Sequence, residues 1–194
     1  MNKLKREDLF SLEEYAGKRQ EYRASVIEHK KNRHVALGEH ATLYFEDRLT
    51  LQYQIQEMLR IEKVFEAEGI NDELDAYNPL IPNGSNLKAT FMIEYSDAEE
   101  RQRVLETLGG VEDKVWLQVE GFDKVYAIAD EDMDRNRDEK TSAVHFMRFE
   151  FTTEMIAGLK TDKDLSMGID YDGFNQLVSP IDKDIKLSLM KDFD

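Results

Sequence analysis

Two arginines, Arg19 and Arg23, lie on the face of the first expected helix that should be buried. A guanidinium carries five N–H donors in a planar fork, so a pair of them can bind a carboxylate or a phosphate through bidentate hydrogen bonds. At about 100° per residue both arginines fall within an apolar arc. That arc comprises Leu9, Leu12, Tyr15, Ala16, Tyr22, Val26 and Ile27. Because an unpaired buried charge is strongly unfavourable, we expect these arginines to meet acidic side chains or an anion.

A second long helix, expected over residues 48–67, supplies acidic side chains. Glu62 falls within its apolar arc, and Glu57 lies one and a half turns earlier on the same helix. In one interpretation Arg19 and Arg23 form an internal salt-bridge network with Glu62 or Glu57, which fixes the register of the two helices without a ligand. In the other they form an anion pocket between the helices. The first interpretation is favoured, and both stay open at this point.

Histidine and glutamate offer metal chemistry. The histidines are His29, His34, His40 and His145. None forms a Glu-x-x-His or His-x-x-x-His pair, so any metal site would be a composite of distant segments. His145 shares a strand face with apolar residues, where an imidazole needs a partner. The first candidate ligands are Glu62, His145, Glu57 and His40, with Glu46 and His29 completing the pool. The alternative is that these histidines are satisfied by hydrogen bonds in the core.

An acidic segment near residue 130 resembles the start of a calcium-binding loop. Asp130, Asp132 and Asp134 alternate, but Arg135 and Thr141 stand where such a loop requires glycine and glutamate. We therefore expect a solvated acidic turn. Cysteine is absent, which excludes thiolate catalysis, disulfides, iron–sulfur ligation and Cys-based zinc sites. No nucleophilic triad, phosphate-binding glycine loop or dinucleotide fingerprint is recognised, so the sequence assigns no catalytic residue and no cofactor.

Composition narrows the class of protein. A chain of 194 residues with 41% hydrophobic content can bury a full core, and we expect one domain over residues 1–194. The net charge of −15 opposes nucleic-acid binding, and the basic run at residues 30–33 is expected to complement a helix dipole. No apolar run approaches the ~20 residues that span a bilayer, and the polar N-terminal segment has no apolar signal core. We expect a cytoplasmic protein with no nucleic-acid or membrane partner.

Hydrophobic periodicity predicts the elements that must position these residues. Helices are expected over residues 7–31, 48–67, 97–108, 153–160 and 181–192. Strands are expected over residues 33–37, 41–46, 87–95, 114–120, 124–129, 143–151 and 164–170. A loop at residues 78–86 carries two of the three prolines. Because helices and strands do not alternate regularly, the pattern indicates an α+β fold, with a largely antiparallel sheet covered by the two long helices.

Four segments carry a resemblance that spans nearly the whole chain. They are FEDRLT at 45–50, YQIQEMLR at 53–60, ELDAYNPLIP at 73–82 and EKTSAVHF at 139–146. Through them the chain resembles a family of uncharacterised bacterial proteins known only as a domain of unknown function. The resemblance implies no established activity, cofactor or catalytic residue. Genes of that family are often found beside those of rubrerythrin-like proteins and iron–sulfur oxidoreductases, which implies an accessory role in peroxide or oxygen defence. The chain lacks the paired Glu-x-x-His helices of a rubrerythrin-type di-iron site, so it should not be the peroxidase.

Two classes of function follow. The first is a cytoplasmic accessory or interaction protein of an oxidative-stress redox system, with a redox protein as partner and with Arg19, Arg23 and Glu62 as structural ties. The second is an enzyme or sensor with a pocket between the two long helices and the proline-rich loop. In that pocket Arg19 and Arg23 would hold an anion. Alternatively, Glu62 and His145 would hold a metal. A homodimer is expected only because homodimers are common.

Overall fold

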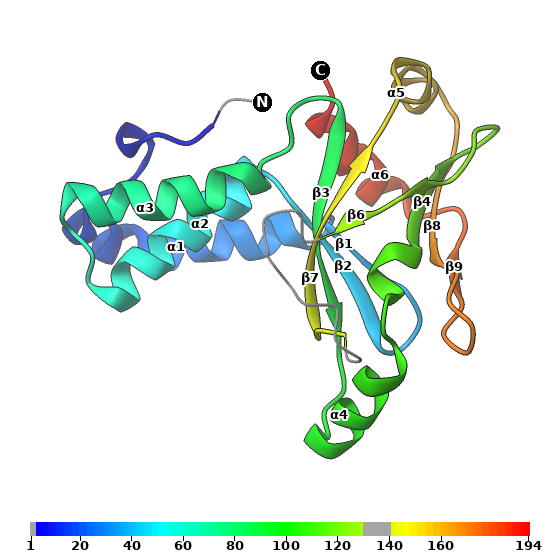
Figure 1. Cartoon of the computed structure of the whole chain (residues 1–194). Coiled ribbons are helices and arrows are strands. Elements are labelled where there is room, and N and C mark those ends of the chain that lie inside the picture. The colour runs from blue at the N-terminus through cyan, green and yellow to red at the C-terminus, as the bar shows by residue number, and fades with distance from the viewer. Residues whose placement is uncertain (1–2, 130–140) are drawn as a thin grey trace.

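A computed structural model of the chain describes residues 3–129 and 141–194 (Figure 1). The helices are α1 (Leu12–Lys30), α2 (Arg48–Glu62), α3 (Ala67–Tyr77), α4 (Ala98–Thr107), α5 (Thr153–Lys160) and α6 (Lys183–Leu189). The short 3-10 helices are η1 (Arg6–Asp8), η2 (Asn78–Leu80), η3 (Val111–Lys114) and η4 (Met190–Asp192). The strands are β1 (His34–Ala36), β2 (Ala41–Glu46), β3 (Asn86–Ile93), β4 (Val115–Val119), β5 (Val125–Tyr126), β6 (Ile128–Ala129), β7 (Val144–Glu150), β8 (Leu165–Ile169) and β9 (Gln176–Val178).

The strands form two antiparallel sheets around one apolar core. The five-stranded sheet has the order β1-β2-β3-β7-β6, and the four-stranded sheet has the order β5-β4-β8-β9. In the central strand β3, Leu87, Ala89, Phe91 and Ile93 are buried while Lys88, Thr90 and Met92 between them are partly exposed, as the period-two pattern predicts. Apolar residues of both sheets belong to the same cluster, together with residues of α5 and α6. The predicted α+β class and the antiparallel pairing are therefore confirmed, whereas the strands form two sheets where one was predicted.

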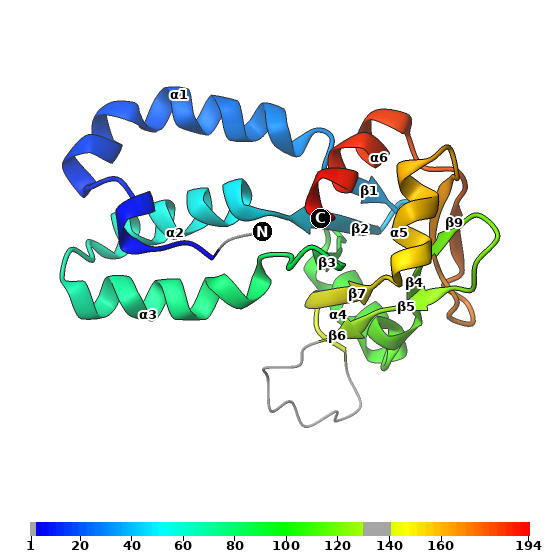
Figure 2. The same cartoon turned by 90° about the horizontal axis from the view of Figure 1, so that it is seen from above.

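Helices α1, α2 and α3 pack against one another beside the sheets and project from them (Figures 1 and 2). We call these three helices the helical arm. The arm has its own apolar cluster, which comprises Leu4, Leu51, Ile55, Leu59, Leu74 and Ile81. The expectation that two long helices cover the sheet is not confirmed. One physical reason is that α1 buries only Tyr15 and Val26, a stripe too narrow to cover a sheet face. The helical residues in the cluster of the sheets come instead from α4, α5 and α6, among them Leu105, Met155, Leu159 and Leu189.

The prediction of one helix over residues 48–67 is wrong in a specific way. Helix α2 ends where Lys63 adopts a left-handed conformation, with φ 57° and its N–H bonded to the Leu59 carbonyl. The chain then reverses into α3, which was not predicted. A residue in the left-handed conformation ends a helix, and it is usually glycine or asparagine. Because the residue here is a lysine, the end of α2 could not be predicted from the sequence. Strand β9 was also not predicted, because three residues are too few to show an alternating pattern.

Most other boundaries agree within a few residues, and the predicted strand at 41–46 coincides with β2. At the N-terminus, Ser11 caps α1 in a capping box with Glu14, so the long helix begins later than the predicted residue 7. The acidic segment containing Asp130, Asp132 and Asp134 lies outside the described residues. Among the described helices, none combines the length and the apolar character that crossing a membrane would require.

Candidate functional site

Arg19 is paired with Glu57 inside the helical arm. Its Nε donates to Glu57 Oε1 at 2.7 Å and its Nη2 donates to Oε2 at 2.8 Å. The Tyr15 hydroxyl donates to the same Oε1 at 2.6 Å. The hydrogen bond from Arg19 is the main reason that the pKa of Glu57 falls to about 2, and Tyr15 adds to the effect. Arg19 therefore forms an internal salt bridge, and its partner is Glu57, one of the two acidic residues that the favoured interpretation offered.

Arg23 and Glu62, the other members of the predicted network, are exposed. The helical periodicity placed both on apolar arcs, but the arm buries a stripe narrower than those arcs, so their side chains reach solvent. The placement of Arg23 and Glu62 on buried faces was wrong. An anion site at Arg19 and Arg23 stays a prediction, with Arg19 held by Glu57 and Arg23 in water.

The four first-choice metal ligands lie in three parts of the fold. Glu57 and Glu62 are on α2, and His145 is buried on β7. His40 lies between β1 and β2, where its ring stacks on Tyr95 with 3.9 Å between centroids. Within the described part of the chain, no three histidine, aspartate or glutamate side chains are arranged to hold a metal ion. The metal site stays a prediction that the described residues do not assemble.

His145 contributes hydrogen bonds to the core. Its Nε2 lies 2.9 Å from the Ser142 carbonyl and 2.9 Å from Thr141 Oγ1. The Thr141 hydroxyl in turn donates to Glu112 Oε2 at 2.9 Å. Because the Ser142 carbonyl can only accept, Nε2 carries the proton and donates it. This geometry corresponds to the core histidine that the sequence offered as the alternative to a metal ligand.

Arg33 forms a buried clasp that the sequence did not predict. The residue is 2% exposed. Its Nε donates to the Phe45 carbonyl, Nη2 to the Glu46 carbonyl and Nη1 to the Ser188 carbonyl, at 3.1, 3.1 and 3.3 Å. Nη1 and Nη2 also donate to the two carboxylate oxygens of Asp192, at 3.3 and 2.5 Å. The clasp thus ties the start of β1, the end of β2 and the C-terminal η4 together.

Asp47 joins the helical arm to this clasp. Its Oδ2 lies 3.4 Å from Arg33 Nε and 2.6 Å from Nε2 of His29, a residue in the last turn of α1. Its Oδ1 accepts the N–H groups of Leu49 and Thr50 and so caps α2. Burial alone would raise the pKa of Asp47, but Arg33, the Thr50 N–H and His29 together lower it. The group is therefore a structural joint between arm and sheets.

The sequence contained a signal for Arg33 that was misread. The run at residues 30–33 was interpreted as a basic helix C-terminus that complements the dipole, yet Arg33, Val35 and Leu37 are all buried and alternate with exposed residues. The same period-two pattern that identified β1 thus places Arg33 on the inner face. What the sequence could not show was the partner, because Asp192 is 159 positions away.

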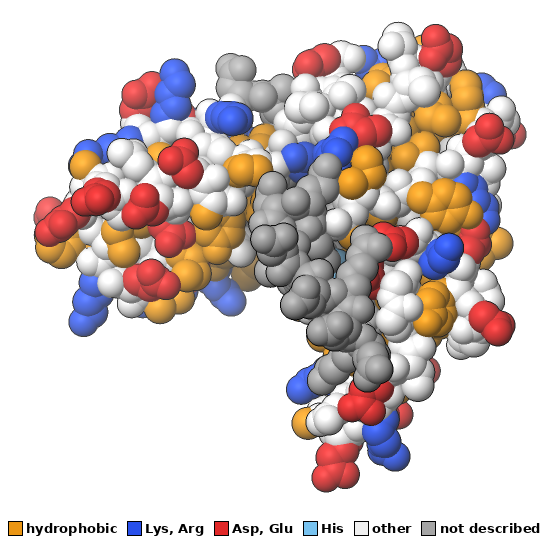
Figure 3. Space-filling model, viewed as in Figure 1, with side chains coloured by type: hydrophobic (Ala, Val, Ile, Leu, Met, Phe, Trp, Pro, Cys, Tyr) orange, Lys and Arg blue, Asp and Glu red, His pale blue; other side chains and the backbone are white. Residues whose placement is uncertain are grey.

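Apolar side chains gather at the outer end of the helical arm. Phe65, in the turn between α2 and α3, is 70% exposed, and Ile61 is 63% exposed. Phe65 lines a groove of about 330 Å³, together with the apolar residues Leu9, Phe10, Leu12, Leu59, Val64 and Ile70. Arg6, Ser11 and Glu14 contribute polar groups to the same lining. Figure 3 shows hydrophobic side chains interspersed with acidic ones over the helical arm. A contiguous patch of exposed apolar groups marks an interaction surface, and the groove with Phe65 is the candidate for one on the arm.

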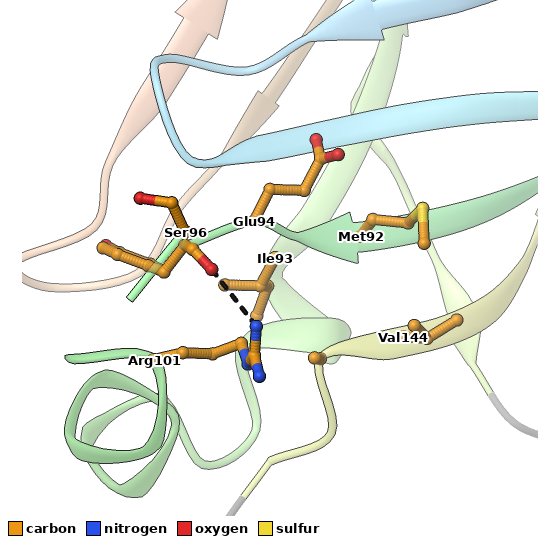
Figure 4. A pocket seen from close by; sticks show the side chains of 8 residues that line it. Met92, Ile93, Glu94, Ser96, Arg101 and Val144 are labelled. Carbon is orange, nitrogen blue, oxygen red and sulfur yellow. Dashed lines mark hydrogen bonds between the residues drawn. The ribbon is translucent and has the colours of Figure 1, made fainter. Parts of the chain in front are cut away.

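A second pocket lies where β3 ends, between α4 and the start of β7 (Figure 4). It has a volume of about 420 Å³ and is lined by Met92, Ile93, Glu94, Tyr95, Ser96, Arg101, Ala143 and Val144. Arg101 Nη1 donates to the Tyr95 carbonyl at 3.2 Å, which holds the guanidinium at the pocket. The Glu94 carboxylate instead accepts from Thr42 Oγ1 at 2.7 Å. The pocket thus combines one cation, Arg101, with apolar walls and with a carboxylate, Glu94, that is bonded to Thr42.

These features belong to an α+β protein in which a three-helix arm is joined to two antiparallel sheets. The chain belongs to the family described as protein of unknown function (DUF3501), whose model matches residues 3–193. It is similar to a crystal structure described as a novel protein of unknown function from Burkholderia pseudomallei K96243. The two chains share 50% sequence identity, each is covered over 100% of its length, and the TM-score is 0.94. A search of curated proteins finds no match to the sequence. The resemblance to an uncharacterised domain family is therefore confirmed, while the gene neighbours it implies stay a prediction.

Proposed function

We propose that this protein is an accessory protein that binds a partner protein through the outer end of its helical arm. The observation that carries the proposal is the exposure of Phe65, which lines a groove of mixed apolar and polar character, with the exposed Ile61 nearby in sequence at the end of α2. Moving an exposed apolar side chain out of water into an interface lowers the free energy. A projecting arm can present such a side chain to another molecule without disturbing the sheets.

The energy available at this surface is suited to binding. Complete burial of a Phe or Ile side chain contributes about 1.5–3 kcal/mol, so burying the exposed parts of Phe65 and Ile61 contributes about 2–4 kcal/mol together. A micromolar complex needs about 8 kcal/mol. The groove that Phe65 lines must therefore also be filled, and a partner side chain inserted between Leu12, Leu59 and Ile70 would supply further apolar contact.

Charge on the turn that carries Phe65 bears on the chemistry of the partner. From Ile61 to Glu68 this segment has three glutamates, Glu62, Glu66 and Glu68, against one lysine, and all four are exposed, whereas the groove lining balances Arg6 with Glu14. Acidic residues on the turn beside Phe65 favour a partner that presents an apolar anchor flanked by lysine or arginine. The net charge of −15 increases the encounter rate with such a basic surface.

We further propose that the partner is a protein of a cytoplasmic redox system connected with oxidative stress. The support for this step is the gene neighbourhood that the resemblance predicts, beside rubrerythrin-like proteins and iron–sulfur oxidoreductases. An accessory role also agrees with the hydrogen bonding of the reactive side chains. Arg19, Arg33 and His145 are each engaged by internal acceptors and so serve the fold.

Site-specific photo-crosslinking tests the docking surface. Phe65 is replaced by p-benzoylphenylalanine in the source cells, and Leu177 is replaced likewise as the control. Leu177 is a matched position because it is 67% exposed but lies on β9, away from the arm. We expect one discrete crosslinked protein from position 65 and none of that mass from position 177. A crosslink from position 65 only to a second copy of the chain would replace a heterologous partner by a homodimer. The same crosslinked protein from both positions would refute docking at the arm.

A further inference from the structure

We propose that the pocket at the end of β3 binds a small monocarboxylate with an apolar body, and that Arg101 recognises the carboxylate. This site is remote from the helical arm and independent of the function proposed for it. Arg101 is half-buried on α4, and its guanidinium lies at the pocket shown in Figure 4.

The guanidinium of Arg101 has unused hydrogen-bonding capacity. Of its five N–H groups, one donates to the Tyr95 carbonyl at 3.2 Å. Among the residues that the structure describes, no carboxylate forms an ion pair with Arg101. A half-buried cation of this kind is stabilised by a bound anion, and the planar fork of arginine matches the two oxygens of a carboxylate.

Glu94 lines the same pocket but is turned away from Arg101. Its Oε2 accepts from Thr42 Oγ1 at 2.7 Å, and its Oε1 lies 3.4 Å from the Tyr44 hydroxyl. In Figure 4 the side chains of Glu94 and Arg101 extend to opposite sides of Ile93. The carboxylate of Glu94 therefore does not neutralise Arg101, and it remains as a negative charge elsewhere in the lining.

The rest of the lining determines the body of the ligand. Met92, Ile93, Ala143 and Val144 supply apolar surface from β3 and from the start of β7. The volume of about 420 Å³ has room for a small ligand, and the pocket is open to solvent on one side. A short alkyl or aryl chain would bury one side against these side chains while its carboxylate meets Arg101.

The charges near the pocket favour a monoanion over a phosphate ester. Glu94 is in the lining, and Glu99 and Glu100 are in the first turn of α4. A group with two negative charges would be repelled by these carboxylates and would have a single guanidinium to oppose them. A monocarboxylate carries a single negative charge, which the guanidinium of Arg101 can neutralise.

Binding of octanoate to the purified full-length protein tests the site. The measurements are the melting temperature and the dissociation constant by calorimetry, with 1-octanol and inorganic phosphate as comparison probes. We expect octanoate to raise the melting temperature while octanol and phosphate do not. Arg101→Gln should weaken octanoate binding by about tenfold or more, since charge-assisted hydrogen bonds are lost.

Arg103→Gln is the matched control, because Arg103 is exposed on the same helix and its Nε donates to the Glu99 carbonyl at 3.3 Å. It should leave octanoate binding unchanged. If Arg101→Gln does not fold, Val144→Asp tests the same site by placing a negative charge on the apolar wall, and it should abolish binding. The proposal is overturned if octanoate does not bind, if Arg101→Gln or Val144→Asp binds it as the parent does, or if phosphate binds better.

Discussion

Removal of the Asp192 carboxylate should destabilise the protein more than any comparable surface change. In the Asp192→Ala variant, Nη1 and Nη2 of Arg33 lose both carboxylate acceptors, while the guanidinium stays buried with 1% of its side chain exposed. Breaking a buried ion pair by deleting one partner costs about 3–5 kcal/mol. Asp47 remains 3.4 Å from Arg33 Nε and opposes part of the charge, so we expect the lower end, about 3 kcal/mol.

Thermal and urea denaturation followed by circular dichroism measure this loss. For a chain of this size, 3 kcal/mol corresponds to a fall in melting temperature of about 6–12 °C. The control is Asp172→Ala, which removes the same carboxylate from an exposed turn. The double variant Arg33→Met with Asp192→Leu should be more stable than Asp192→Ala, because the buried guanidinium is removed while Asp47 keeps His29 and the N–H groups of Leu49 and Thr50 as partners. If Asp192→Ala melts within about 2 °C of the Asp172→Ala control, the clasp does not contribute as described.

Two further predictions concern the tyrosines and Glu57 of the helical arm. The Tyr22 hydroxyl is buried without a hydrogen-bond partner among the described residues, so Tyr22→Phe should leave stability unchanged or raise it by up to about 1 kcal/mol. Tyr15→Phe, which removes a hydroxyl bonded to Glu57, should lower it, and urea unfolding of the two variants gives the comparison. The pKa of Glu57 is lowered from 4.5 to about 2 on folding. Its contribution to stability is therefore complete above pH 4.5 and is lost as the pH falls towards 2. Unfolding free energies measured across this window should fall less steeply in Glu57→Gln than in the parent, and equal slopes would contradict the assignment.

Strand positions could be predicted from the sequence because a half-buried strand alternates apolar and polar residues along the chain. The alternation from Leu87 to Ile93 identifies β3 and its inner face, and the segment at 41–46 identifies β2. Helical periodicity is less complete, since it shows which side of a helix is apolar but not what covers that side. The long helices could therefore be located along the chain, while their packing into a separate arm could not.

Ion pairs could be predicted by type but only partly by partner. Arg19 was expected to meet Glu62 or Glu57, and the structure pairs it with Glu57. The choice depends on the relative rotation of α1 and α2, which no local pattern encodes. Arg33 was missed because its partners come from β2 and the C-terminal segment, which are distant in sequence. Phe65 falls inside the helix predicted over residues 48–67, but it lies beyond the end of α2, because Lys63 adopts a left-handed conformation there.

The central claim is tested most directly with the partner protein that position 65 captures by crosslinking. Its affinity is measured for the parent protein and for a variant of the helical arm. The variant is Ile61→Ser with Phe65→Ser, and the control is Leu177→Ser. Loss of about 2–4 kcal/mol of apolar burial predicts that the arm variant binds about 30-fold or more weakly, while Leu177→Ser binds as the parent does. Equal affinity of the arm variant and the parent would contradict docking at the helical arm.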